Sequence, residues 1–458
     1  MPRLRAIPSR RSPPVAAVNS PHWTQPRALL VRDRTTIFLY ALLAVWGYFN
    51  YGFGPMVALL RDEQQISRGL ASLHGTAFAA GAVVGGTLTP WLVRRYGRAT
   101  SMWWSVGGLG VTILGLCAVR PLPLTLGFAF GVAIAGTTLL SGIVSGLSDH
   151  QRAAAPAAIS EANAAACASG AAAPIVIGAT VAAGWTWRPA VAVVVALFAL
   201  LAVLAWFWRV RLPDGAAAPA AIAPGDAVGP GGTGVPARSA AHRGGRLPKA
   251  YWLAFTVMSL CGSVEVSVNL WAADLLRAQA GLSPANAAAA ISAVVAGMFI
   301  GRVGGGRLAL RYSPTGLLLV ALAVSAIGFG VFWVATAPVL GLVGLVVAGL
   351  GNGLHFPLAI SLALQASDGR PDLATARAAY SLAIAFGLAP FLLGALADAT
   401  SVRSAFLMVP VLLVAAALVV LRIRRGSMDG PRRLEPPVDL GVVRGGGRLL
   451  GIPSGGLS

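Results

Sequence analysis

The chain has 458 residues, of which 56% are apolar and only 11% are charged, and its mean hydropathy is +0.74. A soluble domain carries about 25% charged residues, so this composition excludes an ordinary soluble protein. The net charge of +20 would suit a nucleic-acid-binding protein, but the basic residues lie in the tails and in the loops between apolar segments and form no basic face on a soluble domain. We therefore expect no nucleic-acid partner.

Charged residues divide the chain into apolar segments that are long enough to cross a bilayer core of ~30 Å as helices. Two of these segments contain one internal glutamate each, and the uncharged stretch from Tyr312 to Ala366 has room for two helices. The total is twelve helices, which predicts an integral membrane protein. In chain order the segments are 34–61, 68–94, 98–120, 120–149, 152–188, 188–209, 249–274, 277–302, 312–366, 377–398 and 403–422.

The two halves of the chain repeat each other at one offset of 216 positions: Gly81, Gly85, Leu92, Arg95, Tyr96, Pro174 and Gly178 correspond to Gly297, Gly301, Leu308, Arg311, Tyr312, Pro390 and Gly394. A common offset indicates a duplicated six-helix unit, which is a known transporter architecture. We therefore expect an all-α fold with twelve transmembrane helices in two pseudo-symmetric six-helix bundles. Glycines four residues apart allow close helix approach, either where the halves slide past each other or in static packing.

Composition also predicts the domain boundaries. Residues 1–33 are rich in Arg and Pro and lack an apolar core, so we expect a disordered cytoplasmic tail, with a transit peptide as the alternative. We expect the first bundle at 34–211 and the second at 249–424. Segment 212–248 is rich in Ala, Gly and Pro and predicts a flexible cytoplasmic linker, and 425–458 predicts a second disordered cytoplasmic tail.

The basic residues also predict sidedness. Six of the 35 fall in the loops opposite the expected cytoplasmic side, namely Arg61, Arg68, Arg120, Arg188, Arg277 and Arg403. The excess of basic residues in the tails, the central loop and the other short loops obeys the positive-inside rule and predicts that both termini lie in the cytoplasm. We expect a multi-pass protein of the inner or plasma membrane.

The loop after the second segment carries a family resemblance. The run from Leu92 to Arg98 resembles the signature Gly-x-Leu-x-Asp-Arg-x-Gly-Arg-Arg of the major facilitator superfamily, with Arg94 at the acidic position. A second copy runs from Gly306 to Tyr312. Helix segments 262–271 and 351–357 loosely resemble the fucose-permease-like branch of that superfamily. The resemblance implies transport by two rocking bundles, with gating loops that contain Arg94, Arg95, Gly97, Arg98, Arg307 and Arg311.

Two glutamates lie inside the apolar segments, where an ionised carboxylate costs about 2.5–3.5 kcal/mol on insertion scales. Glu265 shares a helix face with Asn269, and a carboxyl group there could couple a proton to a solute; the alternative is a neutral glutamate hydrogen-bonded to a neighbouring helix. Glu161, beside Asn163, is equally suited to proton carriage and to a conformational role, with Arg302 and Arg377 as plausible partners.

Other polar or aromatic residues in the apolar segments are candidates for solute contact. His355 titrates near neutral pH and has Asn352 three residues before it, which suits a proton relay or a structural hydrogen bond. Aromatic and amide residues of the first segment suit an amphipathic or hydroxylated ligand, or simple packing. The substrate candidates are Trp46, Asn50, Tyr51, Asn163, Asn269, Trp271 and Asn352.

Several functions are disfavoured. The sequence contains no phosphate-binding loop of the kind that ATP-driven pumps need. The three cysteines match no metal spacing. The apolar segments contain no cluster of arginines, which a multiply anionic substrate would need. Asp62 and Glu63 are expected in a solvated loop, so we expect no enzyme, cofactor or metal. We expect a monomeric, proton-coupled secondary transporter of a small neutral or amphipathic solute that works by alternating access in the lipid bilayer. The alternatives are a proton-driven drug or metabolite exporter, and more remotely a membrane-embedded enzyme or a non-transporting sensor.

Overall fold

A computed structural model describes residues 30–210, 212, 247–309, 311–368 and 371–429. Within these residues, twelve helices are long and apolar enough to span a membrane. The expected linker at 212–248 and the tails at 1–33 and 425–458 lie almost entirely outside the described residues. The helices are α1 (Arg34–Gln64), α2 (Arg68–Tyr96), α3 (Arg98–Ala118), α4 (Leu122–Gln151), α5 (Ala155–Ala182), α6 (Arg188–Phe207), α7 (Lys249–Ala280), α8 (Pro284–Ala309), α9 (Pro314–Val334), α10 (Pro338–Gln365), α11 (Pro371–Ala399) and α13 (Met408–Asp429), with a 3-10 turn η1 (Arg152–Ala154) and a short helix α12 (Val402–Ala405).

Local sequence accounts for where these helices begin and end. The side chains of Asp33 and Ser67 accept hydrogen bonds from backbone N–H groups and cap the starts of α1 and α2. The turn between α2 and α3 passes through Gly97 at φ 84°, and α7 ends at Gly281 at φ 62°. Both backbone conformations are left-handed and favour glycine.

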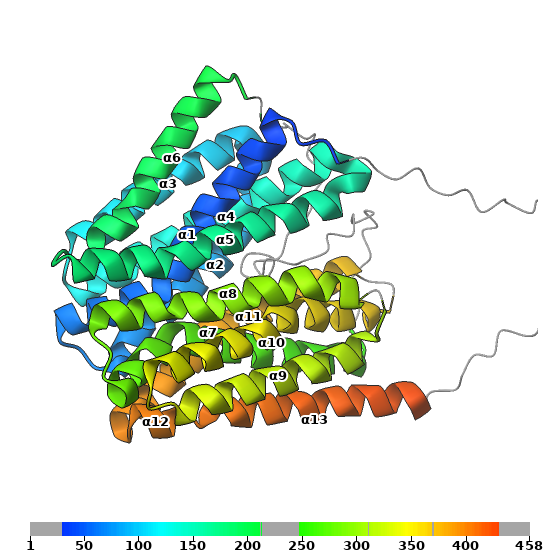
Figure 1. The fold of residues 1–458 in the computed structure, drawn as a ribbon. Coiled ribbons are helices and arrows are strands. Elements are labelled where there is room, and N and C mark those ends of the chain that lie inside the picture. The colour runs from blue at the N-terminus through cyan, green and yellow to red at the C-terminus, as the bar shows by residue number, and fades with distance from the viewer. Residues whose placement is uncertain (1–29, 211, 213–246, 310, 369–370, 430–458) are drawn as a thin grey trace, which may run out of the picture.

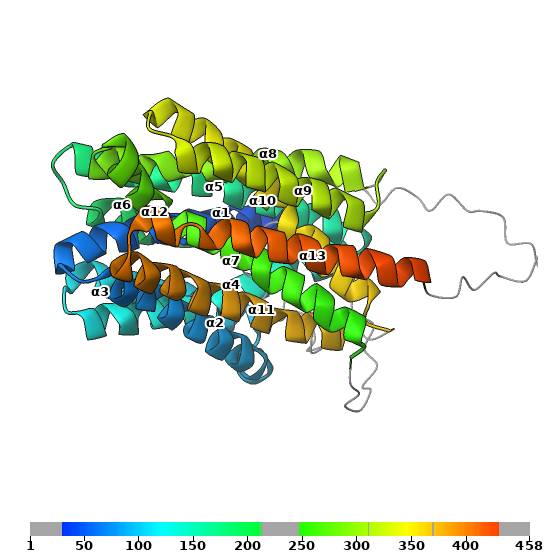
Figure 2. The same cartoon turned by 90° about the horizontal axis from the view of Figure 1, so that it is seen from below.

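The helices form two bundles, α1–α6 and α7–α13, which Figure 1 shows one above the other. Helices α5 and α8 pack against each other across the boundary, and so do α2 and α11. In the view of Figure 2, α1 and α7 lie between these two pairs of helices. The interface between the bundles is therefore built by α1, α2 and α5 on one side and by α7, α8 and α11 on the other.

The glycines of the sequence repeat make equivalent contacts in the two bundles. A Cβ atom added to Gly81 of α2 would meet the backbone of Phe130 in α4, and one added to Gly297 of α8 would meet Val346 of α10. The partners Phe130 and Val346 are separated by 216 residues, as the glycines are. Gly85 and Gly301 repeat this relation with Ile134 and Leu350. These glycines therefore serve static packing inside each bundle, and the expectation of sliding between the halves does not apply to them.

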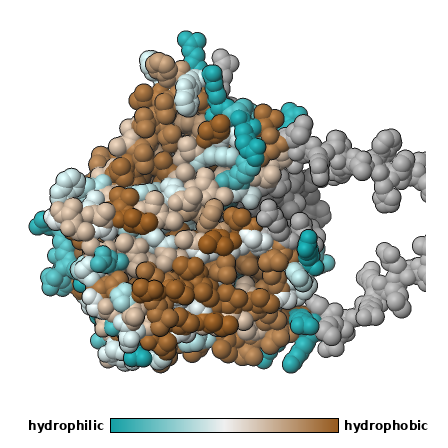
Figure 3. All heavy atoms as spheres, viewed as in Figure 1, coloured by the Kyte–Doolittle hydropathy of each residue, from teal (hydrophilic) through white to brown (hydrophobic). Residues whose placement is uncertain are grey.

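The outer surface of the bundles is apolar over its flank, and polar residues gather toward the two ends (Figure 3). Large exposed side chains on this surface include Val111, Leu200, Val320 and Val411. Such a surface is stable only against lipid, because a soluble monomer rarely exposes an apolar patch of this extent.

The helices run between two ends of the molecule (Figure 1), which we call proximal and distal. The proximal end is the one at which α1 begins and α13 ends, and the distal end is the one at which α1 and α7 end and α2 begins. Figure 1 shows the proximal end at the right and the distal end at the left. Helices α5 and α8 lie close together at the distal end and diverge toward the proximal end.

Candidate functional site

Ion pairs join the two bundles at the distal end. Arg61, in the last turn of α1, pairs with the buried Asp274 of α7 and with its own neighbour Asp62. Asp62 in turn accepts from Arg277 of α7. Arg68 of α2 also donates to Asp274, at 3.0 Å. Together with Asp398 these residues form a network that we call the distal ion-pair cluster.

The start of α2 is held by a carboxylate of the other bundle. Asp398, near the end of α11, accepts hydrogen bonds from the backbone N–H groups of Arg68 at 3.0 Å and Gly69 at 2.7 Å. The first N–H groups of a helix lack partners inside the helix, and the helix dipole favours a negative charge there. A Cβ atom at Gly69 would come within 3.3 Å of the Asp398 carboxylate, so the missing side chain permits this approach. The contact fastens α2 to α11.

The cluster corrects the expectation that Asp62 and Glu63 form a solvated loop. Both residues lie inside α1, which continues to Gln64. Asp62 bridges to the second bundle, and Glu63 pairs with Arg188 at 2.6 Å and with Arg120 at 3.1 Å. Five of the six arginines assigned to the outer loops therefore have carboxylate partners, which are Asp62, Glu63, Asp274 and Asp398.

Four polar side chains from four helices meet at the centre of the molecule. Nη1 of Arg302 in α8 donates to the phenolic oxygen of Tyr51 in α1 and to the sulfur of Cys167 in α5, each at 2.9 Å. Nη2 of Arg302 lies 3.7 Å from Oε1 of Glu265 in α7. The side chains of Arg302 and Glu265 are only 8% and 11% exposed. We call Tyr51, Cys167, Glu265 and Arg302 the central cluster.

A small cavity of about 40 Å³ lies beside the central cluster, between the bundles. This volume holds water-sized groups and is far below the several hundred Å³ of a site that encloses a drug-sized ligand. Its lining combines polar groups with aromatic and aliphatic walls: Asn50, Tyr51, Phe53, Gly54, Gly75, Glu265, Val266, Asn269, Leu270 and Phe386. Helices of both bundles contribute, so movement of one bundle against the other would change the volume.

Four of the sequence-derived candidates line this cavity, namely Asn50, Tyr51, Glu265 and Asn269. The amide nitrogen of Asn269 donates to the backbone oxygen of Glu265 at 3.0 Å, and its amide oxygen is buried without a hydrogen-bond donor among the described residues. From the sequence, Cys167 was assigned no role, and Arg302 was named only as a plausible partner of Glu161.

Two tryptophans that were candidates for substrate contact are packed elsewhere. The Trp46 ring stacks between Phe49 and Phe78, with ring centroids 5.8 and 6.2 Å apart. Trp271 is fully buried and donates to the backbone oxygen of Pro390 at 3.2 Å. Both side chains support the helices around the cavity and are not part of its lining.

Glu161 does not join the central cluster. It pairs with Arg32 near the proximal end and accepts a hydrogen bond from Tyr40 at 3.3 Å, and its side chain is 37% exposed. The sequence suggested Arg302 or Arg377 as the partner of Glu161, but the structure pairs Glu161 with Arg32. Asn163, two residues further along α5, is partly buried. The Glu161 pair therefore fastens the start of the first bundle at its proximal end.

His355 and Asn352 lie inside the second bundle. Both approach the hydroxyl of Ser325 in α9, the histidine Nε2 at 3.1 Å and the asparagine Oδ1 at 3.0 Å. His355 is fully buried, and this group joins α9 to α10. His74 is likewise held between Ala71 and Thr125 at 2.9 Å each. For His355 these contacts fit the alternative of a structural hydrogen bond, and His74 is held by contacts of the same kind.

The residues of the expected gating loops are placed at the proximal ends of α2, α3 and α8. Arg94 and Arg95 are exposed, and Arg95 lies over the Tyr96 ring at 5.6 Å. Gly97 forms the turn, and Arg98 pairs with Asp149 of α4 at 2.6 Å. This ion pair is internal to the first bundle. Arg307 and Arg311 lie at and just beyond the end of α8.

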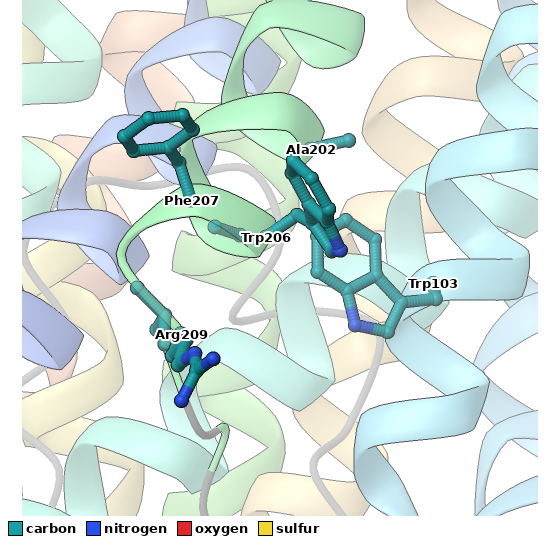
Figure 4. A pocket seen from close by; sticks show the side chains of 7 residues that line it. Trp103, Ala202, Trp206, Phe207 and Arg209 are labelled. Carbon is teal, nitrogen blue, oxygen red and sulfur yellow. The ribbon is translucent and has the colours of Figure 1, made fainter.

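A larger hollow of about 750 Å³ lies on the outer side of α3 and α6, away from the bundle interface. Its lining is Trp103, Ala202, Ala205, Trp206, Phe207, Arg209 and Val210, and Figure 4 shows the aromatic rings and the guanidinium of Arg209 at its edge. Aromatic and basic residues are typical of the zone where a membrane protein meets lipid headgroups. This hollow is a lipid-facing surface feature rather than a path between the bundles.

Twelve spanning helices in two bundles, with a cavity of mixed polar and apolar lining between them, are typical of a membrane transporter for small molecules. A family model described as Major Facilitator Superfamily matches residues 37–371 and 250–452. The chain therefore belongs to the Major Facilitator Superfamily, whose members are transporters and not enzymes. No curated protein sequence matches the chain.

Solved transporter structures share the fold. A bacterial homologue of the human lysosomal transporter Spinster, inward-facing and unoccupied, is 15% identical and aligns over 86% of this chain and 98% of that one, with a TM-score of 0.64. The partially occluded, inward-open xylose transporter XylE from E. coli is 12% identical and aligns over 85% of this chain and 98% of that one, with a TM-score of 0.65. The transporter FucP in the outward conformation is 13% identical and aligns over 85% of this chain and 98% of that one, with a TM-score of 0.56.

Proposed function

We propose that the protein is a secondary active transporter that moves a small neutral or amphipathic solute by alternating access, coupled to protons through Glu265. The observation that carries this proposal is the position of Glu265, buried beside Arg302 and lining the cavity between the bundles. A solute and a proton that bind at one such place can each change the energy of the same bundle arrangement.

The distal ion-pair cluster supports the alternating-access part of the proposal. It holds α1 and α2 against α7 and α11, so the described conformation has its distal end closed. For the cavity to open at the distal end, Arg61 would have to leave Asp274, and Arg68 would have to leave Asp398. Separating a buried ion pair is costly unless both charges are rehydrated, which an opened distal cleft would allow.

Glu265 supports the coupling part. An ionised carboxylate in the membrane interior is unfavourable, and the positive charge of Arg302 at 3.7 Å offsets that cost. When a proton binds to Glu265, this attraction is lost and Arg302 becomes available to other acceptors. Proton binding therefore alters the contacts of Arg302 with Tyr51 and Cys167, which come from the other bundle.

For orientation, we propose that the proximal end faces the cytoplasm of a cell with this protein in its inner or plasma membrane, because the basic residues are concentrated there. A C-terminal tag should then be reached by an impermeant reagent only after the cell is opened, and a tag that reacts on intact cells contradicts this orientation. We also propose that 34–211 and 249–424 fold as the two units and that 212–248 links them. Shortening of 215–245 should leave membrane insertion intact.

Proteoliposomes with an internal pH dye test the proposed function. Sugars, sugar alcohols and amphipathic drugs are added one at a time, and proton movement is followed with wild type, Glu265→Gln and the matched control Glu161→Gln. We expect a solute-dependent pH change that Glu265→Gln abolishes and Glu161→Gln retains, because Glu161 pairs with Arg32 away from the cavity. An unchanged pH response in Glu265→Gln would contradict the coupling role.

A further inference from the structure

The guanidinium of Arg302 is buried with only part of its hydrogen-bonding capacity used. Nη1 donates to Tyr51 and Cys167, but Nε and Nη2 have no hydrogen-bond partner among the described residues. A buried cation with unmatched N–H groups is unfavourable, since each group has lost its hydration. The unmatched edge of Arg302 is therefore prepared to accept a ligand that supplies oxygen acceptors.

Glu265 leaves that edge open. Its Oε1 atom is 3.7 Å from Nη2, which is an ion-pair distance but beyond the 2.7–3.2 Å typical of an N–H···O hydrogen bond. The planar fork of an arginine side chain matches the two oxygens of a carboxylate, which can accept from Nε and Nη2 together. A bidentate carboxylate would make better contacts with Arg302 than Glu265 does in this conformation.

The cavity provides two further recognition elements. The amide oxygen of Asn269 is buried and lacks a donor among the described residues, so it can accept from a hydroxyl group. Phe53, Leu270 and Phe386 form an apolar wall on the same cavity. Glu265 lines the cavity and contacts Arg302, so a ligand would reach the guanidinium by replacing the Glu265 carboxylate.

We propose that the transported solute is a small 2-hydroxy monocarboxylate, whose carboxylate binds Arg302 and whose hydroxyl donates to Asn269. This inference rests on the proposed transport function and narrows its solute to an amphipathic anion, so neutral solutes are not expected to move protons. One guanidinium matches one carboxylate, and the described lining of the cavity contains no cationic side chain that could match a second. Among the described residues, the other titratable side chains that face the pair are Tyr51 from α1, Cys167 from α5 and Cys261 from α7.

The proposal also sets the proton balance. When the solute carboxylate takes Arg302, Glu265 loses its counter-charge and binds one proton from the solvent on that side. The bundles then move with one anion and one proton bound, so the transported charge is zero. On the other side the solute leaves, Glu265 releases its proton to that solvent, and the Glu265–Arg302 pair forms again.

Thermal unfolding of the purified full-length protein in detergent tests the binding step without transport. The probes are glycolate, lactate and mandelate, which differ in body size, with glycolamide, lactamide and mandelamide as neutral counterparts. A ligand that binds only the folded protein raises its melting temperature. We expect at least one acid to raise it with an apparent affinity at least tenfold above that of its amide. Equal effects of acid and amide, or no effect from any of the three acids, would overturn the proposal.

Variants of Arg302 and a matched control locate the site. Arg302→Gln should abolish the shift, and Arg302→Lys, which keeps the charge but lacks the fork, should weaken binding about tenfold. The control Arg32→Gln removes an exposed guanidinium that pairs with Glu161 and should bind as wild type. If Arg302→Gln does not fold, the Lys variant decides, and wild-type affinity in that variant would overturn the assignment.

The outcome also separates this inference from the proposed function. If the acids bind through Arg302 but no proton moves in proteoliposomes, the site assignment stands and proton-coupled transport fails. If neutral solutes drive proton movement that depends on Glu265, while the acids neither bind nor drive proton movement, the proposed transport function is supported and the monocarboxylate assignment is wrong.

Discussion

Nη1 of Arg302 in α8 lies 2.9 Å from the phenolic oxygen of Tyr51 in α1, so a hydrogen bond crosses between the two bundles at the centre of the molecule. The same guanidinium lies 3.7 Å from Glu265. A ligand or proton that changes the contacts of Arg302 with Glu265 therefore also changes a link between the bundles. This relation connects occupancy of the cavity to the position of one bundle against the other.

The first prediction concerns the distal ion-pair cluster. Asp274→Asn leaves the buried Arg61 with Asp62 as its remaining carboxylate partner and should destabilise the distal-closed state by up to about 3–5 kcal/mol. Spin labels at exposed positions Gln65 and Ala278, in a background without the native cysteines, should report a longer distance across the distal end.

The control for this experiment is Arg120→Gln. The side chain of Arg120 is 80% exposed and pairs with Glu63 inside the first bundle, where a surface ion pair contributes about 0–1 kcal/mol. It should leave the label distance unchanged. An equal distance in Asp274→Asn and wild type would show that the cluster does not hold the distal end closed.

The second prediction concerns the contact of α1 with α7. A Cβ atom at Gly54 would meet the backbone oxygen of Asn269 across the bundle interface, so Gly54→Ala forces the bundles apart. We expect a loss of about 1–3 kcal/mol of folded-state stability, as for other overpacked sites, and slower transport. Gly127→Ala in α4 is the matched control, since no described heavy atom lies within 4 Å of its added Cβ. Equal melting temperatures for the two variants would refute the close approach.

The third prediction concerns pH and the cap of α1. Partial burial raises the pKa of Asp33, but hydrogen bonds from Thr36 and His150 lower it more, so the pKa lies below its ordinary value. A carboxyl group with a lowered folded-state pKa adds stability above its unfolded pKa of about 3.9, and this stability is lost as the pH falls through the folded value. Asp33→Asn keeps a capping oxygen but should flatten the fall in melting temperature below about pH 4. A fall as steep as that of wild type would exclude a role for Asp33.

The fourth prediction separates the hydroxyl from the carboxylate in ligand recognition. If the hydroxyl of lactate donates to the amide oxygen of Asn269, Asn269→Ala should weaken lactate binding by two- to tenfold, corresponding to a net hydrogen bond of about 0.5–1.5 kcal/mol. Propionate, which lacks the hydroxyl, should bind wild type and variant alike. Titration of the melting temperature with each acid measures both affinities. A parallel loss for lactate and propionate would point to a general disturbance of the cavity.

The sequence predicted the fold well because each membrane-spanning helix needs its own apolar length, and that signal is local. The repeat at 216 positions predicted the two bundles, and the equivalent contacts of Gly81 and Gly297 confirm it. The sequence could not predict whether these glycines pack within a bundle or between bundles. Glycine spacing shows that another helix can approach closely, but it does not show which helix.

The site was predictable only in part. Glu265 and Asn269 were found because a carboxyl group and an amide on one helix face are conspicuous in an apolar segment. The partners of Arg302 and of Asp274 were not found, because each pair joins helices that are distant in the sequence. His355 and Trp271 show the converse, since polar and aromatic groups in a membrane helix also serve packing.

Transport of labelled lactate by Glu265→Gln tests the central claim most directly. Proteoliposomes are assayed for accumulation driven by an inward proton gradient and for exchange between labelled and unlabelled lactate without a gradient. Because a glutamine neither binds nor releases the coupled proton, we expect the variant to lose gradient-driven accumulation and to keep exchange. Wild-type accumulation that still follows the proton gradient in Glu265→Gln would contradict the claim that Glu265 couples the proton to the solute.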